Sequence, residues 1–305
     1  MGPTAEPPPG LPDQPNLTRH PTATSEDKGN EMNTAPPTEP LNATALQDEF
    51  ASLGVRPGSV LMVHSSLSAF GHVDGGADAV VRALCATVGR KGTIVVPTYT
   101  RQVADPYPDS HAFDDLGTAE ARAAVPLFHD ALPTAMGAVP SAVLGHPDRV
   151  RSRHPQASLA ALGADAHTIC AGQPLGYALG SGSPFAKIHQ LGGSILLLGV
   201  GHNRNSFLHH AESLVPTHRK KLRRFPYLVD GERVWLEALD VGNDNDTHFP
   251  LIGAEFAALG LSRSRVIGSA LCQLVPAVAF VDYARKRLSQ LLHRSGHRRP
   301  SVADI

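Results

Sequence analysis

Residues 59–97 read SVLMVHSSLSAFGHVDGGADAVVRALCATVGRKGTIVVP, and their hydrophobic pattern determines the architecture. The apolar run Ser59 to His64 predicts a short buried strand. Gly76 to Val88 carry helical periodicity, which Gly89 ends, and Gly92 to Pro97 predict a second buried strand. Strand, helix and strand within about 40 residues form a βαβ unit, which requires a parallel strand pair covered by helices.

The pattern on either side extends this unit into one larger α/β domain. A helix capped by Asn42 or Thr44 and ended by Gly54 precedes it, and the apolar run Ser194 to Val200 supplies a further strand. From about Thr100 to Gly193 the chain is rich in Pro, Gly and His, which is typical of functional loops. Beyond it we expect, in order, a hairpin of Phe225 to Val229 and Arg233 to Ala238 around the Asp230-Gly231 turn, a helix Phe249 to Leu259, a strand near Val266 and a helix Leu271 to Leu292.

Composition divides the 305 residues into an ordered domain and two tails. Residues 1–40 hold 10 of the 26 prolines and almost no aliphatic residues, so we expect a disordered Pro-rich tail there, a single domain over 41–292 and a basic C-terminal tail over 293–305. No secretory signal or membrane-spanning run occurs in the sequence, which favours a cytoplasmic protein without a membrane partner. A net charge of −1 and a pI of about 7.0 do not indicate a nucleic-acid partner.

The cysteines and basic runs carry little functional signal. Cys85, Cys170 and Cys272 lie far apart among apolar residues and are interpreted as reduced core thiols, so we expect no metal. The run Arg219 to Arg224 could meet a phosphate-bearing ligand or be an ordinary solvated face. The C-terminal run from Arg285 to Arg299 is interpreted as a solvated helix end and tail.

The segment Ser206-Phe-Leu-His-His-Ala-Glu212 offers a candidate acid–base pair. If Asn205 or Ser206 caps a helix, His209 and Glu212 lie three residues apart on one face, whereas His210 points away. A carboxylate beside an imidazole sets its tautomer and raises its basicity, which suits a general base. On spacing alone, a surface helix with an incidental His/Glu pair is an equal alternative.

Two loops follow the predicted strands where open α/β sheets bind ligands. The first strand ends with His64, Ser65, Ser66 and Leu67. The next helix begins with Gly75-Gly76, which could form either an anion-binding site or an ordinary tight turn. The dinucleotide and P-loop fingerprints are absent. A Ser65 or Ser66 triad with His209 and Glu212 is conceivable, but the Gly-x-Ser-x-Gly elbow is missing.

Read in order, these segments resemble the antibiotic N-acetyltransferase family, which includes the aminoglycoside 3-N-acetyltransferases. The resemblance extends from about Leu41 to Leu292, and the matching stretches are VHSSLSAFGHVDGGADAVVRAL, GRKGTIVVPTYT, PTAMGAVP, RSRHPQAS, GSGSPFAKI, SILLLGVG and the H-x-A-E that ends at Glu212.

The resemblance implies a three-layer α/β/α fold with a largely parallel sheet and an antiparallel C-terminal hairpin. It implies acetyl transfer from acetyl-CoA to an amino group of an aminoglycoside antibiotic, with His209 as base and Glu212 as its partner. Ser65, Ser66 and Leu67 match the region lining the thioester, and Ser152 and Ser158 match polar positions near the coenzyme arm. Past the second strand, Tyr99 and Asp105 could offer the amine a ring face and an anion, or be ordinary loop residues.

The chain also departs from the family pattern. Gln173 replaces the usual histidine, Gly176 the acidic residue three places later, and Ser141 and Leu144 stand where charged residues are usual. The charge balance is not that of an acidic cleft for polycations. A second interpretation is therefore the same reaction on an amino-sugar or aminonucleoside intermediate; a serine hydrolase and a non-catalytic binder are weaker alternatives. The oligomeric state stays open.

Overall fold

The computed structural model describes residues 41–109 and 116–296. The tail expected over 1–40 lies outside the described residues. Of the basic C-terminal tail, residues 293–296 are described, as the end of the last helix.

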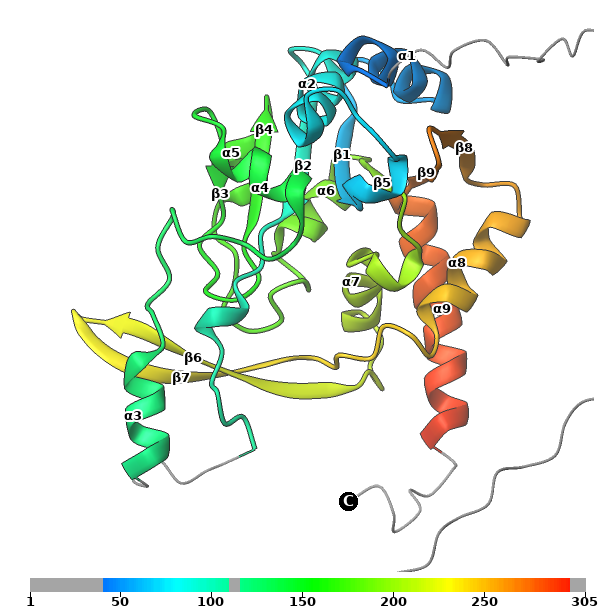
Figure 1. The fold of residues 1–305 in the computed structure, drawn as a ribbon. Coiled ribbons are helices and arrows are strands. Elements are labelled where there is room, and N and C mark those ends of the chain that lie inside the picture. The colour runs from blue at the N-terminus through cyan, green and yellow to red at the C-terminus, as the bar shows by residue number, and fades with distance from the viewer. Residues whose placement is uncertain (1–40, 110–115, 297–305) are drawn as a thin grey trace, which may run out of the picture. The chain divides into compact units, whose positions relative to one another are not determined.

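A seven-stranded mixed sheet forms the centre of the domain (Figure 1). Its three middle strands are parallel, as predicted: β1 (Val60–Ser65) pairs with β2 (Thr93–Pro97) on one side and with β5 (Ser194–Leu198) on the other. The outer strands are antiparallel, namely β4 (Leu159–Gly163) and β3 (Val150–Arg151) beyond β2, and β9 (Ala270–Pro276) and β8 (Arg263–Ile267) beyond β5.

Alternation along β1 directs its side chains into two separate cores. Leu61 and Val63 pack in a cluster with α1 (Ala43–Leu53), α2 (Gly76–Val88) and α4 (Ala138–Gly145). Met62 points to the opposite cluster. That cluster is completed by α5 (Ala166–Cys170), α6 (Pro184–Gln190), α7 (Phe207–Ser213), α8 (Phe249–Ala258) and α9 (Ala277–Gly296). The helices therefore cover both faces, and the predicted three-layer α/β/α fold is confirmed.

Local capping reproduces the predicted helix ends. The Asn42 side chain accepts a hydrogen bond from the Ala45 N–H at 3.0 Å, and Gly54 ends α1 in the left-handed region. Helix α2 has the predicted bounds, Gly76 to Val88. The remaining described helix is α3 (Leu116–Ala124), and the short 3-10 turns are η1 (Leu67–Phe70), η2 (Arg101–Val103) and η3 (His202–Arg204).

The predicted hairpin is present and longer than expected. Strands β6 (Lys220–Val229) and β7 (Glu232–Val241) form a separate two-stranded sheet. Asp230 and Gly231 both have positive φ, 51° and 85°, as a tight hairpin turn requires. Most of the basic run, Lys220 to Arg224, is part of β6, and two of its arginines are paired within the fold, Arg223 with Asp240 and Arg224 with Glu237.

One predicted helix began too early. Residues Leu271 to Pro276 belong to strand β9, and the helix starts at Ala277. The alternation is that of a strand, since Leu271 is 52% exposed and Cys272 is fully buried. The middle region also contains strands β3 and β4, which its poor periodicity concealed.

Within the described ranges, no helix combines the length and the apolar character needed to cross a bilayer. Cys85, Cys170 and Cys272 are all free thiols. No group of three metal-ligating side chains occurs among these residues.

Candidate active site

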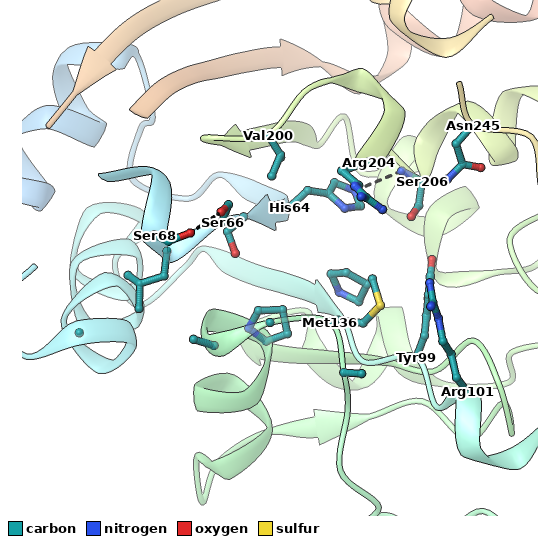
Figure 2. Close-up of a pocket in the computed structure, with 18 of the residues that line it drawn as sticks. His64, Ser66, Ser68, Tyr99, Arg101, Met136, Val200, Arg204, Ser206 and Asn245 are labelled. Carbon is teal, nitrogen blue, oxygen red and sulfur yellow. Dashed lines mark hydrogen bonds between the residues drawn. The ribbon is translucent and has the colours of Figure 1, made fainter. Parts of the chain in front are cut away.

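A cleft of about 1230 Å³ opens at the carboxyl ends of the three parallel strands (Figure 2). His64, Ser65 and Ser66 from the end of β1 line it, together with Tyr99 after β2 and Val200 after β5. Leu67 and Gly76 line it as well. Six of the residues predicted from the sequence, from His64 to Tyr99, therefore meet in one place, where α/β sheets bind their ligands.

His64 joins the end of β1 to the start of α7. Its Nε2 atom accepts a hydrogen bond from the Ser206 backbone N–H at 3.4 Å, drawn as a dashed line in Figure 2. Burial, with a smaller contribution from His202, lowers the pKa of His64 to about 3. The ring is therefore neutral at physiological pH and able to accept this bond.

Helix α7 presents His209 and Glu212 on one face, as their spacing predicts. Ser206 is the N-cap of the helix, and the side chain of the preceding Asn205 accepts a bond from the Phe207 N–H at 3.1 Å. The Nδ1 atom of His209 lies 3.5 Å from Oε2 of Glu212, longer than a well-formed hydrogen bond. Catalytic contacts are often this long before substrate binds. His209 keeps 14% of its side chain exposed, and Ser206, just before α7, lines the cleft.

The neighbouring His210 contacts the core instead of Glu212. Its Nδ1 lies 2.7 Å from the Leu179 carbonyl oxygen. Burial lowers the pKa of His210 to about 4. Its ring is thus held in the core as a neutral donor, away from Glu212.

Glu212 is fully buried and ionised. Burial raises the pKa of this carboxyl, but contacts with His209 and Arg219 outweigh that effect and leave the pKa below its usual range. The Arg219 Nε lies 2.9 Å from Glu212 Oε1. One carboxylate oxygen therefore faces the guanidinium and the other faces the imidazole.

Six predicted site residues are not part of the cleft lining: His209 and Glu212, which lie on the helix after the lining residue Ser206, and four residues elsewhere in the fold. Ser152 and Ser158 are fully buried, where Ser152 bonds Gln173 Oε1 at 2.6 Å and Ser158 bonds the Thr98 carbonyl at 2.9 Å. Asp105 makes a buried ion pair with Arg122, with Nε 2.9 Å from Oδ1. Gly75 caps α2 with φ of 78°. Ser152, Ser158, Asp105 and Gly75 therefore have structural roles in this fold.

Gln173, which departs from the family pattern, connects three segments. It accepts the Ser152 hydroxyl and donates to the carbonyl oxygens of Ala157 (3.0 Å) and Ala178 (2.8 Å). The neighbouring His154 is equally structural, with Nδ1 accepting from the Ala157 N–H at 2.9 Å. The segment from Arg151 to Ser158 is therefore a buried support, exposed only at Arg153.

The charge of the cleft lining is positive. Among the described residues that line it, none is Asp or Glu and three are arginines, Arg101, Arg204 and Arg223. Arg223 is paired with Asp240, but within the described chain the Arg101 and Arg204 guanidiniums make no ion pair. Tyr99 points its hydroxyl toward the Ser206 and Asn245 region (Figure 2), and burial raises the pKa of Tyr99 to about 12, so it remains a neutral donor.

The family model described as aminoglycoside 3-N-acetyltransferase matches residues 62–289. The chain belongs to the aminoglycoside 3-N-acetyltransferase family. It is 34% identical over 272 residues to aminoglycoside N(3)-acetyltransferase VII of Streptomyces paromomycinus, covering 84% of this chain and 94% of the relative. The carboxyl ends of all three cleft strands and the His209/Glu212 helix lie within the matched residues.

Solved structures of aminoglycoside acetyltransferases share the fold. AAC(3)-Xa superposes with a TM-score of 0.77 at 34% identity, covering 84% of this chain and 95% of that one. AAC-IIIb in a binary complex with CoASH gives 0.73 at 31% identity, covering 82% and 97%. Sisomicin-bound AAC-VIa gives 0.74 at 28% identity, covering 83% and 99%.

Several cleft residues of this family member were missed from the sequence. Met136, Gly137 and Ala138 belong to the PTAMGAVP stretch, whose motif was a signal without an assigned role. Arg101 and Arg204 come from the short 3-10 turns η2 and η3, and Asn243 and Asn245 from an irregular loop, so their side-chain direction cannot be read from periodicity.

A tight contact behind α7 gives a testable expectation for stability. A Cβ on Gly253 would lie 2.2 Å from Cγ and Cδ2 of His202. That ring cannot move freely, because it lies 3.2 Å from both Asn205 Nδ2 and Gln273 Oε1 and packs on Phe280. We expect Gly253→Ala to lower the free energy of unfolding by about 1–3 kcal/mol through overpacking, measured by urea unfolding.

The matched control is Gly145→Ala, also in a helix, where a Cβ would meet no atom within 4 Å. It should be neutral or stabilising, since alanine favours helices by up to about 1 kcal/mol. Equal destabilisation by both changes would contradict the packing argument.

Proposed function

We propose that this chain transfers the acetyl group of acetyl-CoA to the 3-amino group of an aminoglycoside, with His209 as the general base. The observation that carries the proposal is the pair of half-buried His209 and buried Glu212, on the helix that follows the cleft residue Ser206, in a member of this family. The relatives named for this reaction, the CoASH complex and the sisomicin complex support the two substrates. We expect the reaction to take place in the cytoplasm and the acetylation to confer antibiotic resistance.

The pair supplies what amine acetylation requires. A protonated amine has no lone pair, so His209 must take a proton, directly or through water, as the nitrogen approaches the thioester carbonyl. Glu212 holds the imidazole and stabilises its charged form. The nitrogen adds to the carbonyl carbon to give a tetrahedral oxyanion, which collapses as the C–S bond breaks. The departing thiolate takes up the nitrogen's second proton, so that the products are the amide and CoASH.

The loop after β1 is suited to stabilise the tetrahedral oxyanion. The Ser66 N–H is committed to the sheet, since it bonds the Leu198 carbonyl at 2.9 Å. Leu67 and Ser68 open the 3-10 turn η1, and the first N–H groups of a helix have no partner within it. Backbone donors aimed at developing negative charge are the usual device for acyl transfer. We assign this role to the Leu67 and Ser68 N–H groups.

The cleft has groups that suit the coenzyme. Ser65 Oγ is buried without a hydrogen-bond partner among the described residues and lines the cleft, which fits a ligand amide or carbonyl. Arg101 and Arg204 suit phosphates, which guanidinium groups bind in bidentate fashion. His64, Ser65, Ser66, Leu67 and Gly76 would hold the thioester end, and Tyr99 the acceptor.

A serine hydrolase is disfavoured by the partners of the two serines. Ser66 Oγ lies 3.2 Å from Ser68 Oγ, and within the described chain Ser65 Oγ has no histidine partner to activate it. A fluorophosphonate probe checks this point. We expect neither serine to be labelled, and labelling of either would overturn direct transfer.

The arginine-lined cleft favours a second candidate, the same transfer to an amine that also carries an anionic group. An aminoglycoside is a polycation, and like charges on a cleft wall weaken its binding. Arg101 and Arg204 would instead pair with a phosphate or carboxylate on an amino sugar or aminonucleoside.

Thiol release from acetyl-CoA, followed with each acceptor, tests both candidates. Sisomicin is compared with glucosamine and glucosamine 6-phosphate. Turnover with sisomicin supports the first candidate, and selective turnover of the phosphorylated sugar supports the second. In an Arg101→Gln/Arg204→Gln variant, a raised KM for acetyl-CoA alone would assign the arginines to the coenzyme, and a raised KM for the acceptor alone would assign them to the amine.

A further inference from the structure

Arg219 lies between two carboxylates. Its Nε atom is 2.9 Å from Glu212 Oε1, its Nη1 is 2.5 Å from Asp244 Oδ2, and its Nη2 donates to the Asp244 carbonyl oxygen at 3.1 Å. Gly242 makes room for this side chain, because a Cβ there would lie 2.9 Å from Arg219 Cβ. The guanidinium is thus fixed in one orientation.

Asp244 also shapes the segment that enters α8. Its Oδ1 accepts the backbone N–H groups of Asp246 at 3.1 Å and Thr247 at 3.0 Å. Phe249, the first residue of α8, packs edge-on against His209 with ring centroids 4.8 Å apart. Arg219 therefore connects two groups that contact the His209 imidazole. It binds Glu212 directly, and through Asp244 it holds the segment that leads into Phe249.

We propose that Arg219, held by Asp244, is a positioning residue that orients Glu212 and sets how tightly the His209/Glu212 pair holds a proton. The proposal rests on the proposed role of His209 as base. Glu212 alone would draw a proton strongly onto the neighbouring imidazole, since both groups are sheltered from water. The guanidinium offsets this attraction and leaves the imidazole free to accept a proton from the amine.

Other charged groups face the same carboxylate. Lys221 on β6 and His248 before α8 both interact with Glu212, in addition to Arg219 and His209. Burial lowers the pKa of Lys221 to about 8 and lowers that of His248. Lys221 is the same in every variant compared, and His248 requires its own control on the acidic side.

The test compares pH profiles of kcat/KM for native protein, Arg219→Gln and Arg219→Lys. Without the guanidinium, the pair binds a proton at higher pH whichever atom carries it. We expect the acidic arm of the Arg219→Gln profile to move up by about one pH unit, a tenfold change in proton affinity. Arg219→Lys keeps the charge but not both contacts and should shift less.

Two controls separate positioning from a general loss of charge. Arg265→Gln removes an arginine that pairs with Glu49 between β8 and α1, and its acidic arm should stay at the native position. His248→Gln should likewise leave the arm in place. In a Glu212→Gln background, adding Arg219→Gln should produce no further shift, because the group through which Arg219 acts has lost its charge.

An NMR titration of the His209 imidazole, with signals identified by their loss in His209→Gln, measures the same shift without any acceptor. Asp244→Asn keeps the Arg219–Glu212 contact and should give a smaller shift in the same direction, which provides a test if Arg219→Gln does not fold. A folded Arg219→Gln protein with a native His209 titration would overturn the proposal. Loss of activity in Arg219→Gln without a shift in the His209 titration would also overturn the proposal about Arg219. An inactive native protein would instead contradict only the proposed acetyl transfer.

Discussion

Replacing His209 with alanine is expected to lower kcat/KM for acetyl transfer by a factor on the order of 10²–10⁴, the usual contribution of a general base. The amine arrives protonated, and no other described side chain combines a neighbouring carboxylate with this position on α7. Because the ring is only 14% exposed, it adds little binding surface. The Kd for coenzyme A should therefore be unchanged. Thiol release measures kcat/KM, and calorimetry measures the Kd.

The pH dependence sharpens this prediction. As the pH rises, more of the free amine is already deprotonated, so the ratio of native to His209→Ala activity should fall. His209→Gln, which keeps a polar side chain of similar size, serves as the control for packing against Phe249. A His209→Ala protein with native activity across the pH range would show that another group removes the proton.

Glu212→Gln is expected to lower kcat/KM by a factor on the order of 10², the lower end of a general base's contribution, since the amide keeps the shape but cannot stabilise a charged imidazole. Glu212→Ala should also destabilise the fold. It leaves the Arg219 guanidinium, 28% exposed, without one of its two carboxylates. We expect a loss of about 1–3 kcal/mol in the free energy of unfolding, below the value for a fully buried pair because solvent screens the guanidinium.

The sign of the acid dependence follows from the lowered pKa of Glu212. A group whose pKa is lower in the folded state stabilises the protein above its unfolded pKa, and that stability is lost as the pH falls through the folded value. Native protein should therefore lose stability on acidification more steeply than Glu212→Gln, measured by thermal unfolding below the usual glutamate pKa. Parallel curves for the two proteins would contradict the assignment of this carboxylate as ionised.

Regular periodicity and local chemistry explain which parts of the fold could be predicted. The βαβ unit follows from two apolar strands around an amphipathic α2, and the hairpin from Asp230-Gly231. The His209/Glu212 pair follows from a three-residue spacing within one helix. Strand β9 was missed because its apolar residues run directly into α9, so a strand and a helix share one continuous segment.

Side-chain direction in irregular segments explains most of what the sequence could not show. Asp105 lies past strand β2 and Ser158 directly before strand β4, yet the backbone turns both side chains inward, to Arg122 and Thr98. Arg219 contacts Glu212 and Asp244 through a turn and a loop that carry no periodic signal. Such long-range ion pairs depend on tertiary structure, and the resemblance to the family did not indicate them.

The most direct test of the proposed reaction is to identify its product. Native protein is incubated with acetyl-CoA and sisomicin, and the product is analysed by mass spectrometry and two-dimensional NMR. We expect a single added acetyl group on the 3-amino nitrogen, formed at a greatly reduced rate by His209→Ala. Failure to acetylate sisomicin or any other aminoglycoside, by a protein that binds coenzyme A, would contradict the assigned substrate, and acetylation at another nitrogen would contradict the assigned position.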